Sequence, residues 1–181
     1  MMHTASPHLP LDAPQPGLGT QSKMKILVID DEPVNVALLE AMLGDSGYTR
    51  VQPLTDSRAA LETCDSFAPD LILLDLMMPF VDGFAILEAL RSTPRDIFLP
   101  VIVLTADANE QTKRRALRAG ATDFLLKPFD ETEVLLRIGN MLEIRRLHLQ
   151  LDTQRAAFEE AVRERTSELR EAQSALEQAS W

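Results

Sequence analysis

Three carboxylates, a hydroxyl and an ammonium group stand at the ends of short apolar runs in this 181-residue sequence. They belong to Asp30, Asp31, Asp75, Thr105 and Lys127. If the apolar runs are parallel strands, their carboxyl ends share one edge of a sheet, and the five side chains converge there. Clustered carboxylates repel one another unless a cation joins them, and hard oxygen ligands favour Mg²⁺. A carboxylate beside Mg²⁺, with a lysine and a hydroxyl nearby, is suited to accept a phosphoryl group.

Asp75 ends the most informative of these runs, the four apolar residues 71–74. A short, continuous apolar run is typical of a strand that is buried on both faces, as in a parallel sheet. Taken alone, an aspartate after such a strand is more often a turn or helix-cap residue. The ordered set of polar strand ends is what favours a functional site.

Strand-like and helix-like patterns alternate five times along the chain. The expected strands are Lys25–Ile29, Arg50–Leu54, 71–74, 99–104 and Asp123–Leu126. The expected helices run from residue 33 to 44 or 47, from 56 or 57 to 67, from 83 through 90 and from about 109 to 118. Pro53 suggests a position in an edge strand or at the end of a strand. The alternation predicts an α/β fold, namely a doubly wound five-stranded parallel sheet with helices on both faces.

The composition excludes several classes of protein. The formal net charge is −10, and the basic face of a nucleic-acid reader is not apparent, so we expect no direct DNA binding. We find neither a secretory signal nor an apolar run of the ~20 residues that a membrane span needs. The single cysteine, Cys64, excludes an internal disulfide and fits a reducing compartment. We therefore expect a cytoplasmic protein that does not insert into membranes, with Cys64 as a buried structural thiol.

Residues 1–23 contain four prolines and no hydrophobic periodicity, which predicts a disordered leader. Met24 is a plausible true or alternative start.

After Pro128 the pattern becomes one long helix, Glu131–Ala179, in which Gly139 is the weak point. A heptad register can be drawn through it, and nine of its twelve core positions are apolar. The a positions are Met141, His148, Arg155, Val162, Leu169 and Leu176, and the d positions are Ile144, Leu151, Phe158, Arg165, Ala172 and Ala179. This register predicts a coiled coil and a parallel homodimer. The alternative is a solvated helix that packs on the domain for only two turns.

Over residues 24–142 the sequence resembles the CheY-like receiver domain of two-component response regulators. The residues that carry the resemblance are Asp30-Asp31, Asp75, Met78-Pro79, Asp82-Gly83, Thr105-Ala106, Gly120-Ala121 and Lys127-Pro128. The resemblance implies a flavodoxin-like sheet and phosphorylation by a histidine kinase or a phosphotransfer protein. It implies no catalysis beyond phosphorylation and dephosphorylation of the chain itself.

The same resemblance implies a role for each site residue. Asp75 is expected to be the phosphoacceptor, and Lys127 is expected to pair with the phosphoryl oxygens. The peptide bond between Lys127 and Pro128 is expected to be cis. Thr105 is the expected switch hydroxyl. The expected Mg²⁺ ligands are Asp30, directly or through water, Asp31, Asp75 and the backbone carbonyl of Met77.

Phe124 is the expected switch aromatic, whose rotamer follows Thr105, although an ordinary strand residue is a serious alternative. A second aspartyl-phosphate chemistry, that of haloacid-dehalogenase-like phosphatases, needs an Asp-x-Asp-x-Thr pattern after the first strand. Residues 30–34 read Asp-Asp-Glu-Pro-Val and do not fit that pattern.

The output of the chain stays open. Residues 143–181 hold six basic and eight acidic residues and no second helical unit, so we expect a signalling helix there rather than a DNA-binding domain. Residues 162–169 look like helices that join receivers to HD-GYP cyclic-di-GMP phosphodiesterases, diguanylate cyclases or histidine kinases. One hypothesis is a module whose dimeric helix passes on the signal, and another is the truncated front end of a longer enzyme. A constitutive coiled-coil scaffold is the least favoured, and the natural C-terminus is undecided.

Overall fold

The computed structural model describes residues 23–93 and 98–179, and its core is a five-stranded parallel sheet. The strands lie in the order β2-β1-β3-β4-β5. They are β1 (Lys25–Ile29), β2 (Arg50–Leu54), β3 (Leu71–Asp75), β4 (Val101–Thr105) and β5 (Asp123–Leu126). The helices are α2 (Pro33–Asp45), the 3₁₀ turn η1 (Ser57–Ala59), α3 (Ala60–Phe67), α4 (Gly83–Ser92), α5 (Glu110–Arg118) and α6 (Glu131–Ala179). Apart from Lys23, the expected leader lies outside the described residues.

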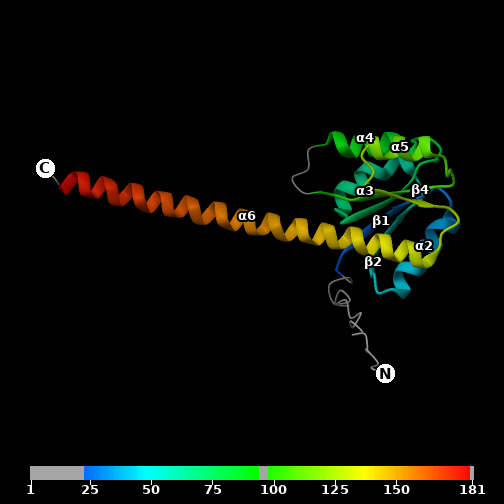
Figure 1. Ribbon diagram of the computed structural model, residues 1–181, viewed down its shortest axis with the longest axis horizontal. Coiled ribbons are helices and arrows are strands. Elements are labelled where there is room, and N and C mark those ends of the chain that lie inside the picture. Colours follow the sequence, from blue (N-terminus) through cyan, green and yellow to red (C-terminus); the bar gives the residue numbers. More distant parts are fainter. Residues whose placement is uncertain (1–22, 94–97, 180–181) are drawn as a thin grey trace, which may run out of the picture.

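Helices cover both faces of the sheet (Figure 1). Helices α3, α4 and α5 contribute to one buried cluster, and α2 and the first turns of α6 contribute to the other. Successive residues of β1 alternate between the two clusters, as the pleat of a strand requires. Every residue of β3 and β4 is buried, which explains why their sequences are continuous apolar runs. The predicted doubly wound α/β fold is confirmed.

Two local features differ from the sequence-based expectation. Strand β4 begins at Val101 rather than at residue 99, because Pro100 has no N–H to donate to the ladder. Strand β3 ends at Asp75, as the sequence predicts. The segment before α3 is a 3₁₀ turn whose Asp56 carboxylate accepts a hydrogen bond from the Arg58 N–H. Pro53 lies, as expected, in the edge strand β2.

Helix α6 is one continuous helix of 49 residues that leaves the α/β unit and projects far from it (Figure 1). Its first turns pack on the sheet through the buried residues Val134, Ile138 and Leu142. The contacts continue past residue 142, since an Arg145 Nη donates to the carbonyl of Phe98 at 2.6 Å and the His148 ring lies 5.1 Å from that of Phe98. From residue 153 to 179 every residue is exposed. Within the described segments, we find no helix with both the length and the apolar character of a membrane span.

Candidate functional site

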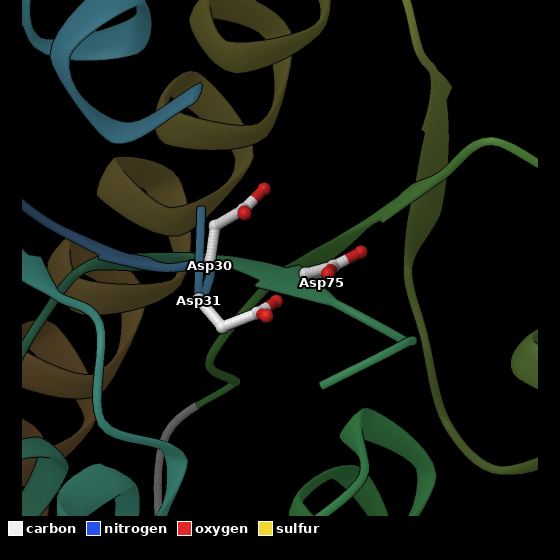
Figure 2. A group of neighbouring side chains, drawn as sticks. All are labelled: Asp30, Asp31 and Asp75. Carbon is white, nitrogen blue, oxygen red and sulfur yellow. The ribbon is translucent and has the colours of Figure 1, made fainter. Parts of the chain in front are cut away.

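Three carboxylates gather at the carboxyl edge of the sheet. Asp30 and Asp31 follow β1 and Asp75 ends β3, and these two strands are direct neighbours, with Ile29 paired to Leu74. One oxygen from each carboxylate lies within 4.8 Å of the other two (Figure 2). Asp30 and Asp75 are buried, whereas Asp31 is half-buried. The convergence that the strand ends predict is therefore present for all three.

Lys127 crosses to this cluster from the end of β5. Its Nζ lies 2.8 Å from Asp30 Oδ2 and 3.1 Å from Asp75 Oδ1. Its backbone N–H donates to the carbonyl of Thr105 at 2.9 Å, and its peptide bond to Pro128 is cis. One ammonium group thus holds two buried carboxylates that belong to different strands.

Burial and charge oppose each other in this cluster. Burial raises the pKa of Asp75, while the Lys127 charge lowers it and the Asp30 charge raises it, so that the pKa stays above the ordinary value. A backbone hydrogen bond from Met77 also favours the ionised Asp75. Burial lowers the pKa of Lys127, but the hydrogen bonds and charges of Asp30 and Asp75 outweigh this effect and raise it. Lys127 therefore stays protonated between the carboxylates.

Thr105 ends β4 with its side chain buried, and its Oγ1 accepts a hydrogen bond of 3.0 Å from the Asp107 N–H. Thr105, Met77 and Ala106 line a pocket of about 410 Å³ between the segment after β3 and the start of α5. The pocket leaves space beside the expected switch hydroxyl.

Phe124 lies on β5, where it is half-buried and packs against one core cluster. Its ring lies below two cations, with Lys113 Nζ 4.7 Å and the Arg137 guanidinium 5.7 Å from the ring centroid. Arg137 is fixed in turn by Asp123, whose two oxygens each accept from one Arg137 Nη at 2.8 Å. The ring thus joins β5 to α5 and α6.

Two residues that support the site were missed in the sequence. Asn35 in α2 donates its amide to both oxygens of Asp30 at 3.2 Å. An amide between Val34 and Val36, in the first turn after the paired aspartates, is the signal that could have found it. Ser57 bonds the loop after β3, but its partners are more than twenty residues away, and the sequence around it carries no sign of them.

The donor set fits a hard divalent cation. It consists of carboxylate oxygens at close range, with more negative charge than Lys127 can neutralise. Met77, whose backbone carbonyl is an expected ligand, follows Asp75 by two residues at the same edge of the sheet. These are the oxygen ligands that Mg²⁺ takes in proteins, where it also keeps several waters.

Comparisons with known proteins agree with this geometry. A family model described as the response regulator receiver domain matches residues 26–139. The DNA-binding dual master transcriptional regulator RpaA of Synechocystis sp. is 41% identical over 118 residues, which are 65% of this chain and 48% of that protein. Response regulator PleD of Caulobacter vibrioides is 38% identical over 117 residues, which are 65% of this chain and 26% of PleD. This chain therefore spans half or less of the length of these relatives.

Solved structures show the same fold. Chemotaxis protein CheY4 of Vibrio cholerae superposes with a TM-score of 0.61 at 30% identity, covering 65% of this chain and 98% of that chain. A "probable two-component system response regulator/GGDEF domain protein" superposes with a TM-score of 0.66 at 27% identity, covering 71% of this chain and 52% of that chain.

Proposed function

Since this chain belongs to the family of response regulator receiver domains, we propose that it accepts a phosphoryl group on Asp75 from a histidine kinase or a phosphotransfer protein. The observation that carries this proposal is the position of Lys127 Nζ, within 3.1 Å of both Asp75 and Asp30, beside the third carboxylate of Asp31. A buried carboxylate that an ammonium keeps available is a suitable nucleophile.

In the proposed reaction an oxygen of Asp75 attacks the phosphorus of the donor. The new bond joins that oxygen to phosphorus, and the bond from phosphorus to the donor nitrogen or oxygen breaks, its electron pair leaving with the donor. Asp75 must be ionised for this attack. Burial works against ionisation, while Lys127 and the Met77 N–H favour it.

We propose that Asp30, Asp31, Asp75 and the carbonyl of Met77 hold Mg²⁺. When bound, the cation would neutralise charge on the phosphoryl oxygens. Asn35 and the backbone N–H of Glu32 hold the Asp30 carboxylate, the latter at 3.0 Å, so that it keeps its direction toward the site. Holding ligands in place before the cation arrives reduces the entropy lost on binding.

The proposed switch begins at Thr105. Once Asp75 carries a phosphoryl group, the Thr105 hydroxyl turns toward its oxygens and gives up the hydrogen bond from Asp107. Phe124 is then expected to move into space that the Thr105 side chain vacates. The two cations above its ring belong to α5 and α6, so this movement would reach both helices.

For the output, we propose a receiver at residues 24–142 and a signalling helix at residues 143–181, which pairs with a second copy as a parallel coiled coil. The exposed apolar side chains of α6 support this proposal. An unpaired helix of this length would leave the apolar side chains at its a and d positions, the seam of the coiled coil, in water. Beyond His148 they are Leu151, Phe158, Val162, Leu169 and Leu176.

A second proposal is that the chain is the regulatory front end of a longer enzyme. The similarity to a structure whose name includes a GGDEF domain, only about half of which is covered, supports it. The two proposals are compatible, because a parallel coiled coil would hold two downstream modules side by side.

Incubation with acetyl phosphate and Mg²⁺, followed by intact mass spectrometry, tests the phosphoacceptor. We expect the mass of one phosphoryl group on the wild type and on the control Asp152→Asn, which lies in the outer part of α6. We expect none on Asp75→Asn. Undiminished modification of Asp75→Asn would contradict the proposal.

A further inference from the structure

The loop that follows Asp75 is closed at its base. The Leu76 N–H donates to the carbonyl of Leu104 at 3.2 Å, and the Gly83 N–H returns to the carbonyl of Leu76 at 3.0 Å. The Asp82 carboxylate caps α4 by accepting from the Ala85 N–H at 2.8 Å. Both ends of the loop are therefore fixed, and its path depends on residues 77–81.

The middle of this loop is strained. Phe80 has a φ of +69°, and the Val81 N–H donates to the carbonyl of Pro79 at 2.9 Å, which closes a three-residue turn around it. Positive φ is rare for a bulky residue, and a turn of this kind is rarely adopted without support. The Phe80 side chain is 78% exposed, so burial of its ring does not hold the turn.

One hydroxyl bridges the two ends of the turn. Ser57 Oγ donates to the carbonyl of Pro79 at 2.7 Å and accepts from the N–H of Val81 at 3.2 Å. Ser57 is 3% exposed and belongs to η1, in the connection after β2. The next residue, Arg58, places its guanidinium 4.5 Å from the centroid of the Phe80 ring. A neighbouring connection thus holds the strained turn from both its backbone and its side-chain sides.

We propose that Ser57 is a positioning residue of the phosphoacceptor site. It fixes the turn at residues 79–81, and through it the direction of the Met77 carbonyl toward the three carboxylates. The Met77 side chain is 76% exposed and gives no anchor, so beside the Met77 N–H bond to Asp75 the backbone of Met77 depends on the rest of the loop. Met78 is buried, but a flexible thioether chain fixes no direction. The inference rests on the proposed function, in which that carbonyl and the carboxylates bind Mg²⁺.

The test is a Mg²⁺ titration of the unphosphorylated chain, monitored by NMR of the backbone amides and by calorimetry. We expect Ser57→Ala to weaken the affinity about five- to tenfold, as for the loss of one buried hydrogen bond. The matched control is Ser66→Ala, because the Ser66 hydroxyl is exposed and bonds only carbonyls of its own helix. It should bind as the wild type does.

A second change separates positioning from general stability. In the Ser57→Ala background, Phe80→Gly removes the cost of positive φ and should recover part of the lost Mg²⁺ affinity. If Ser57→Ala does not fold, Ser57→Cys keeps the volume with a weak donor and acceptor, and it should weaken binding in the same direction.

Two results would overturn the inference, and they can be told apart. If the wild type binds Mg²⁺ in a way that Asp31→Ala abolishes, but folded Ser57→Ala binds equally well and only its Tm falls, Ser57 has a structural role alone. If Asp31→Ala binds as the wild type does, the proposed metal site fails, and the positioning role fails with it.

Discussion

Lys127 sets the electrostatic balance of the site. Its ammonium faces two buried carboxylates, and a third, Asp31, lies within the same group. Without a metal the site therefore holds an excess of negative charge. Burial is the largest cause of the raised pKa of Asp75; the Lys127 charge limits the rise and the Asp30 charge adds to it.

Lys127→Met is expected to lower the free energy of unfolding at neutral pH by on the order of 3 kcal/mol, because it leaves buried charge unpaired. It should also raise the pKa of Asp75 further. A carboxyl whose folded-state pKa exceeds its unfolded value destabilises the fold above that pKa, and the cost disappears as the pH falls below the unfolded value. The loss should therefore shrink in acid, as urea unfolding at several pH values would show.

The control for this prediction is Lys23→Met, which removes an exposed lysine at the start of the described chain. A loss in Lys127→Met that stays constant from neutral to acid pH would contradict the electrostatic explanation.

Gly83 supports the phosphoacceptor through contact rather than charge. A Cβ at this position would lie 2.1 Å from the carbonyl oxygen of Asp75, where backbone has no room to move. We expect Gly83→Ala to cost more than about 3 kcal/mol of unfolding free energy by overpacking. Gly139 in α6 has open space around it, so Gly139→Ala should stabilise by about 1 kcal/mol. Urea denaturation measures the change in unfolding free energy of each variant. Changes of equal size and sign would contradict the close contact at Gly83.

At this scale the sequence predicts the residues that end strands but not those that support them. Asp30, Asp31, Asp75 and Lys127 come together because parallel strands share an edge, a rule that needs only the order of the elements. Ser57 contacts a loop 22 to 24 residues further along, and that contact depends on how two connections pack.

Among the elements, α6 has a first part that packs on the sheet and a second part that is exposed. Val134, Ile138 and Leu142 lie on the face that packs on the sheet, and Met141 packs against the same cluster. The first a positions of the heptad register, Met141 and His148, are thus already in contact with the α/β unit. A coiled coil would accordingly begin beyond His148, later than the sequence register alone indicates.

Leu169→Asp is expected to dissociate the proposed dimer, because it buries a charge at an a position of the seam. Leu169 is 60% exposed in the single chain, so the substitution should leave the stability of the α/β unit unchanged. Ser174→Asp, at the outward f position of the same heptad, is the matched control and should remain dimeric. Light scattering gives the answer, and a monomeric wild type at micromolar concentration would defeat the coiled coil.

Element boundaries show where local rules stop. The five strands and the long helix follow from apolar runs and heptad spacing. The start of β4 depended on the missing donor of Pro100, a local fact that can be read from the sequence. The end of the packed part of α6 could not be read, because Arg145 and His148 are polar and their partner Phe98 lies in another connection.

For the whole molecule, the site and the long helix are only a few residues apart. Lys127 contacts the carboxylates, and α6 begins at Glu131, where Asp130 accepts from the Glu133 N–H at 2.9 Å. Arg137 then ties α6 to Asp123 at the start of β5. A change at Asp75 that moves Lys127 is therefore expected to change the angle at which α6 leaves the unit.

Mg²⁺ is expected to stabilise the whole fold, because it binds the folded site and not the unfolded chain. At about a hundredfold excess over the dissociation constant the gain is about 2.7 kcal/mol. Thermal unfolding with MgCl₂, against NaCl of equal ionic strength, measures it. Asp31→Ala should lose the gain, and a gain that persists in that variant would place the cation elsewhere.

Of the 28 acidic residues in the chain, Asp75 is the one that we propose to carry the phosphoryl group. Borohydride reduces an aspartyl phosphate to homoserine, which marks the position permanently. The most direct test treats the full chain with acetyl phosphate and Mg²⁺, then borohydride, and locates homoserine by peptide mass spectrometry. We predict homoserine at position 75 alone, and none in Asp75→Asn. Homoserine at Asp30 or Asp31, or its absence from the wild type, would contradict the assignment of Asp75 as phosphoacceptor.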